Sequence, residues 1–140
     1  MRVFVYFNLH RKCWSIKALE GPRKGRVIGH ADYVDLAAVE WKVSEAGRQR
    51  VLREKKKNVH AGAVGTLERW QTPEGDAHGM PFASTTFDKI SFRNTTMVPE
   101  MVTYNPYKGP SFTDRDTGED VRRSRAAYLC PDRNIYAWSH

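Results

Sequence analysis

The chain has 140 residues, of which 40% are hydrophobic, 11% are aromatic and 28% are charged. This composition is typical of one folded domain, spanning residues 1–140, and it excludes a disordered chain and a chain with several domains. Lys and Arg outnumber Asp and Glu by 23 to 16, and the resulting net charge of +7 indicates an anionic partner. The alternative is that the charge only keeps the protein soluble.

The N-terminal third has the side-chain pattern of β-strands. We expect strands at Val3 to Phe7 and at Cys13 to Leu19, joined by a turn at residues 8–12. A third strand is expected at Arg26 to Ala31, after a turn rich in Gly and Pro. A fourth is expected at residues 39–43, where apolar and charged side chains alternate.

Ser44 predicts the start of a helix, because its hydroxyl can cap the first turn and Glu45 suits the positive end of the helix dipole. The helix is expected to run to about Lys57. Its apolar stripe, which includes Val43 and Val51, is narrow, so the helix should lie on a sheet and not inside it.

The rest of the chain indicates one curved strand followed by several short ones. Small residues alternate from Val59 to Leu67, which predicts close approach of neighbouring backbones or strong curvature. Residues 70–86 contain several Pro and Gly residues and are expected to form a long loop. Short strands are then expected at Phe87 to Phe92, Met97 to Tyr104, Ser111 to Thr113, Tyr128 to Cys130 and Asn134 to Trp138.

These elements predict an α+β fold that is predominantly β. We expect a small curled antiparallel sheet or a barrel, with one principal basic helix.

Positive charge is concentrated around the expected helix. Between Lys42 and His60 there are seven cationic side chains and only two glutamates. Such cations can neutralise phosphates and release their counterions, which favours nucleic acid or a ribonucleoprotein complex as the partner. The alternative is a solvated helix face. The candidate contacts are Arg48, Arg50, Arg53, Lys55, Lys56 and Lys57.

A second candidate group combines aromatic and basic side chains. Tyr104, Tyr107 and Lys108 lie in a stretch rich in Pro and Gly, and Arg122, Arg123 and Arg125 follow it. Exposed Tyr rings beside cations can stack on unpaired bases. The alternative is an ordinary turn whose aromatic residues fill the core.

The histidines offer a catalytic alternative. His10, His30 and His60 each lie beside or between expected strands. If two histidines and a lysine met across a sheet, they could act as base, acid and phosphate stabiliser and cleave RNA without a metal, because imidazole titrates near neutral pH. His10 and His60 would then be the catalytic candidates. The sequence does not show that they meet.

No common catalytic or metal-binding motif is present. The chain has no P-loop, no dinucleotide fingerprint, no HExxH and no GxSxG. Residues 114–120 depart from a calcium loop and are expected to form a hairpin turn. We therefore expect no cofactor and no metal.

The two cysteines, Cys13 and Cys130, are far apart in the sequence, so neither a zinc knuckle nor a disulfide framework is indicated. The N-terminus lacks the pattern of a signal peptide, and no apolar run approaches the roughly 18 residues of a membrane span. We expect a cytoplasmic protein without a membrane partner.

Three stretches carry a resemblance to known sequences: Val5 to His10, Val43 to Ala61 and Val102 to Lys108. In them the chain resembles a family of small, uncharacterised basic proteins encoded by bacteriophages and prophages. The segment from Glu68 to Glu100 shows no such resemblance, which suggests an insertion. The resemblance implies a phage origin and the host cell cytoplasm as the location, and it implies no activity.

The first functional hypothesis is therefore a phage-type protein that binds nucleic acid or a nucleoprotein through its basic helix. A second hypothesis, raised by the phage resemblance, is an inhibitor of a host defence complex of the CRISPR type. A third is a metal-independent ribonuclease. A virion component is also compatible with the sequence.

Overall fold

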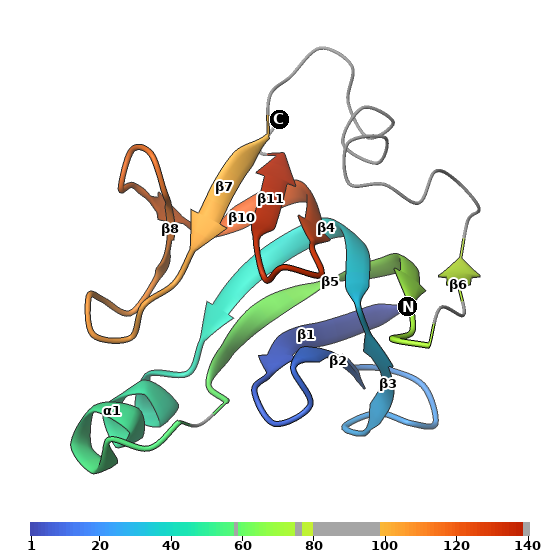
Figure 1. The fold of residues 1–140 in the computed structure, drawn as a ribbon, viewed down its shortest axis with the longest axis horizontal. Coiled ribbons are helices and arrows are strands. Elements are labelled where there is room, and N and C mark those ends of the chain that lie inside the picture. Colours follow the sequence, from blue (N-terminus) through green and yellow to red (C-terminus); the bar gives the residue numbers. More distant parts are fainter. Residues whose placement is uncertain (58, 75–76, 80–98, 139–140) are drawn as a thin grey trace.

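The computed structural model describes residues 1–57, 59–74, 77–79 and 99–138, which contain eleven strands and one helix (Figure 1). The helix is α1 (Glu45–Glu54). The strands are β1 (Arg2–Asn8), β2 (Cys13–Ala18), β3 (Val27–Ala31), β4 (Tyr33–Val43), β5 (Ala61–Gln71), β6 (Ala77–Gly79), β7 (Glu100–Thr103), β8 (Phe112–Asp114), β9 (Asp120–Val121), β10 (Arg123–Leu129) and β11 (Ile135–Trp138).

All the strands pair antiparallel, in the order β3-β2-β1-β5-β4-β10-β11-β7-β8-β9, with β6 beside β5. The expected predominance of β structure is confirmed. Along the described strands the sheet stays open between β3 and β9, so it is not a closed barrel.

The half of the sheet that contains β8 curls back over β4. Three strands separate β4 from β8 in the sheet, yet the rings of Trp41 and Phe112 lie 5.1 Å apart. Both rings belong to the main buried cluster, which also contains Val5 and Ile16 from the other half. The curl therefore closes one core and places β4 opposite the β8–β9 hairpin.

Several expected elements are confirmed and some extend further than expected. β4 begins at Tyr33 and β10 at Arg123. Tyr33 to Leu36 and Ala126 to Leu129 are buried on both faces of the sheet, so these parts lack the alternation that marks a strand, whereas Arg123 and Arg125 are exposed. The expected loop at residues 70–86 is interrupted, since β5 continues to Gln71 and β6 follows. Residues 75, 76 and 80–86 of that loop and the expected strand at 87–92 lie outside the described residues. The hairpin turn expected at 114–120 joins β8 to β9.

The helix ends earlier than the sequence indicated. Ser44 caps it as expected, accepting a hydrogen bond from the Gly47 N–H at 3.2 Å, but Lys55 adopts φ +58° and stops it at Glu54. The expected extension to Lys57 is therefore wrong. The helix itself contains three arginines and two glutamates. Most of the net positive charge between Lys42 and His60 therefore lies on the lysines before and after the helix.

Sheet pairing explains where the helix stops. Residues 44–60 connect two paired strands, and the Ser44 N–H donates to the His60 carbonyl at 2.6 Å, so the connection must return to its starting point. A ten-residue helix is about 15 Å long, and the five residues 55–59 can span about 17 Å. A helix that ran to Lys57 would leave too little chain to return.

Gly62 allows β1 and β5 to approach closely. A Cβ atom there would overlap the carbonyl oxygen of Val5 and lie 2.8 Å from the ring of Phe4. The close backbone approach expected from the small residues of this strand is thus confirmed. No helix in the described part of the chain is long and apolar enough to cross a membrane.

We predict that Gly62→Ala lowers the free energy of unfolding by about 1–3 kcal/mol, because the backbone of Val5 has to move. Gly109→Ala is the matched control, since a Cβ there meets nothing within 4 Å. Urea denaturation of both variants measures the effect. Equal stability of the two variants would contradict the close approach.

Candidate functional site

Two segments that are far apart in the sequence lie together at the end of the sheet. The Arg48 Nε donates to the carbonyl oxygen of Pro106 at 2.9 Å, and the Lys55 Nζ lies 5.7 Å from the centre of the Tyr107 ring. His60 Nε2 and the Tyr104 hydroxyl are 2.6 Å apart. The basic segment and the aromatic segment predicted from the sequence therefore form one surface.

The 104–110 segment is held in a defined turn. The side-chain oxygen of Asn105 accepts a hydrogen bond from the Tyr107 N–H at 2.9 Å. The backbone carbonyl of Asn105 accepts one from the Lys108 N–H at 3.1 Å. Pro106 has the fixed φ that suits the turn. The turn presents Tyr107 on the surface, where 60% of the residue is exposed.

Tyr104 has a different role from Tyr107. It is half-buried, and its ring stacks on Phe112 with the centroids 5.0 Å apart. Burial raises the pKa of Tyr104, and Glu45 adds to the rise while Arg48 opposes it. Tyr104 therefore anchors the segment to the core and to His60, and Tyr107 offers the exposed ring.

Most of the charge on the helix itself is already engaged. Arg48, whose side chain is only 14% exposed, pairs with Glu45 at 2.8 Å, and Arg50 pairs with Glu54 at 3.0 Å. By contrast, five other cations take part in no ion pair within the described part of the chain. They lie in the last helical turn, directly after the helix or in the 104–110 segment. They are Arg53, Lys55, Lys56, Lys57 and Lys108.

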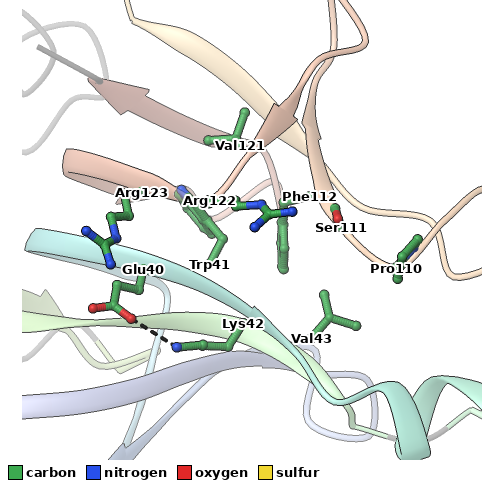
Figure 2. Close-up of a pocket in the computed structure, with 10 residues that line it drawn as sticks. All are labelled: Glu40, Trp41, Lys42, Val43, Pro110, Ser111, Phe112, Val121, Arg122 and Arg123. Atoms are coloured by element: carbon green, nitrogen blue, oxygen red, sulfur yellow. Dashed lines mark ion pairs between the residues drawn. The ribbon is translucent and has the colours of Figure 1, made fainter.

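A groove of about 450 Å³ continues this surface (Figure 2). It lies between β4 and the β8–β9 hairpin, where the curl of the sheet brings them together. Pro110, the last residue of the 104–110 segment, and Val43, which precedes the N-cap of α1, lie at one end of the groove. The lining residues are Glu40, Trp41, Lys42, Val43, Pro110, Ser111, Phe112, Val121, Arg122 and Arg123.

The mouth of the groove carries excess positive charge. Glu40 pairs with Lys42 at 3.0 Å, and this hydrogen bond and charge lower the pKa of Glu40, with smaller contributions from Arg123 and Arg2. Arg122 is exposed on the other side of the groove (Figure 2). Several cations thus share one carboxylate.

We call the combined region the cationic surface. It consists of Lys55, Lys56, Lys57, Tyr107 and Lys108 together with the groove residues Lys42, Arg122 and Arg123. The sequence analysis noted the two arginines but did not identify the groove, because the groove depends on the curl of the sheet. Arg125 is exposed but does not line the groove.

The histidines each have separate neighbours. His10 is exposed in the β1–β2 turn, His30 Nδ1 lies 3.1 Å from the Ser15 hydroxyl, and His60 contacts Tyr104. No hydrogen bond joins two histidines among the described residues. In the same part of the chain, no cluster of three or more His, Cys, Asp or Glu residues could hold a metal ion.

Fold and surface define a small, predominantly β protein with an open curled sheet and a cationic, aromatic surface beside its one described helix. Residues 1–137 match the family of the Mycobacterium phage L5 gene 82 protein, and the chain belongs to that family. The resemblance to phage-encoded proteins is thereby confirmed. The match runs through the segment from Glu68 to Glu100, for which the sequence analysis suggested an insertion.

The Gene 82 protein of Mycobacterium phage L5 is 39% identical to this chain over 135 residues, which cover 92% of this chain and 90% of that protein. No solved structure matches the chain.

We predict that Tyr104→Phe lowers the free energy of unfolding at pH 7 by about 1 kcal/mol, because the variant cannot form the hydrogen bond to His60. The raised pKa of Tyr104 means that the unfolded chain loses this proton first as the pH rises past about 10, so the wild-type protein loses stability there. The Tyr104→Phe variant should lose less stability over the same rise in pH. Urea denaturation between pH 7 and pH 11 measures both effects, and parallel stability curves would contradict the raised pKa.

Proposed function

We propose that this protein binds nucleic acid through the cationic surface. The observation that carries the proposal is the position of Tyr107, an exposed ring with Lys55 over it and Lys108 next to it in the chain. Cations neutralise phosphates, and an exposed aromatic ring can stack on a base. The ring beside the cations matches the bases and phosphates that follow one another along a nucleic acid, which favours nucleic acid over an acidic protein.

The helix acts mainly as a support in this proposal. Arg48 and Arg50 are engaged by Glu45 and Glu54, so they are less available to phosphates than the sequence analysis supposed. The lysines that follow the helix are exposed and supply the charge. The groove arginines extend the same charge toward the centre of the sheet.

Binding without cleavage is the form of the proposal that the geometry favours. The ribonuclease hypothesis needs two imidazoles at one reacting phosphate. His60 is half-buried against Tyr104, and His10 is exposed in a turn with its own neighbours. Neither histidine lines the groove.

The lysines should supply affinity through charge. We predict that replacing Lys55, Lys56 and Lys57 together with Gln weakens binding to any nucleic acid sequence. It should also flatten the slope of log affinity against log salt by about 0.7 for each phosphate of a single strand that the variant no longer neutralises. Fluorescence anisotropy with labelled oligonucleotides at several salt concentrations measures both quantities.

A matched control removes the same charge elsewhere. Replacing Arg23, Lys24 and Arg26 with Gln changes the β2–β3 turn, which lies far from α1 (Figure 1). This variant should keep most of the affinity. If both triple variants lose affinity equally, net charge alone drives the binding. If the wild-type protein binds no nucleic acid at low salt, the proposed function is wrong.

A further inference from the structure

The geometry points to single-stranded nucleic acid as the ligand, with an unpaired base stacked on Tyr107 and the adjoining phosphates held by the lysines and by the groove arginines. This inference rests on the proposed function and narrows it to one class of nucleic acid. It depends on three features of the structure: the exposed ring on an anchored turn, the neutral exposed side of the helix and the place of the groove.

The Tyr107 ring is exposed on a turn whose backbone is held in position. The Asn105 side chain binds the Tyr107 N–H, and Arg48 binds the carbonyl of Pro106, so the backbone on the N-terminal side of the ring is anchored. An exposed aromatic ring on an ordered turn loses little entropy when a base stacks on it. Bases inside a duplex are already stacked on their neighbours, and only an unpaired base can use this ring.

The helix is poorly suited to reading a duplex. A recognition helix enters the major groove between two phosphate backbones and needs cations along its exposed side. The exposed charged residues of α1 are two arginines and two glutamates, because Arg48 is turned toward Pro106. That exposed side is neutral, and a duplex would meet Glu45 and Glu54 as well as the arginines.

The groove gives the single-stranded nucleic acid a path beyond Tyr107. Pro110, at one end of the groove, is three residues from Tyr107, a span of at most about 11 Å. A volume of about 450 Å³ falls in the range of sites that hold small organic ligands, so one nucleotide unit fits. Trp41 and Phe112 are less than 10% exposed, so they form the floor, and Arg122 and Arg123 are placed at the sides for phosphates.

The experiment compares three labelled ligands of about 20 units by fluorescence anisotropy: oligo(dT), oligo(rU) and a mixed-sequence DNA duplex. The wild-type protein should bind at least one single strand about tenfold more tightly than the duplex. Tyr107→Leu should weaken single-strand binding about tenfold and leave duplex binding unaffected. Tyr107→Phe, which retains the ring, should weaken it no more than about threefold.

Tyr107 is exposed, so the variants should fold, and thermal unfolding followed by circular dichroism checks this. Duplex binding as tight as single-strand binding would overturn the inference, as would a Tyr107→Leu variant with unchanged single-strand affinity. In either case charge-driven binding, and with it the proposed function, would stand. Absence of binding to all three ligands would overturn both. Tighter binding of either single strand than of the duplex supports the inference, whichever of oligo(dT) and oligo(rU) is preferred.

Discussion

The hydrogen bond from Arg48 to the carbonyl of Pro106 joins two segments that are 58 residues apart, and the candidate site depends on it. A bond from a charged donor contributes about 1.5–3 kcal/mol, more than one between neutral groups. Arg48 can reach Pro106 because Gly47, next to it, lets the helix approach His60, where a Cβ would lie only 2.6 Å from that of His60. Tyr107 and Lys55 meet as a consequence.

The sheet places both halves of the site. Pairing of β4 with β5 forces the chain between them to return, which limits the length of α1 and leaves the three lysines after it as an irregular exposed segment. The curl of the sheet brings β8 over β4 and forms the groove on a floor of Trp41 and Phe112. The same packing that closes the core therefore creates the surface on which the proposed function depends.

Local patterns predicted much of the fold and only part of the site. The Ser44 cap, most strands and the close approach at Gly62 depend on neighbouring residues or on small side chains, and the sequence indicated them. The end of the helix depends on pairing between residues on either side of it. The ion pair of Arg48 with Glu45 has a local spacing that the sequence analysis did not use. The contact of Tyr104 with His60 and the hydrogen bond from Arg48 to Pro106 join residues more than 40 positions apart, which no local pattern carries.

Nuclear magnetic resonance mapping tests the binding surface most directly. The ¹⁵N-labelled protein would be titrated with an unlabelled single-stranded oligonucleotide of about ten units, and the backbone amide shifts would be followed. The account predicts that the largest shifts fall on residues 53–57, on residues 105–109 and on Arg122 and Arg123, with little change in the β2–β3 turn. Shifts confined to other parts of the sheet, with residues 105–109 unchanged, would contradict it.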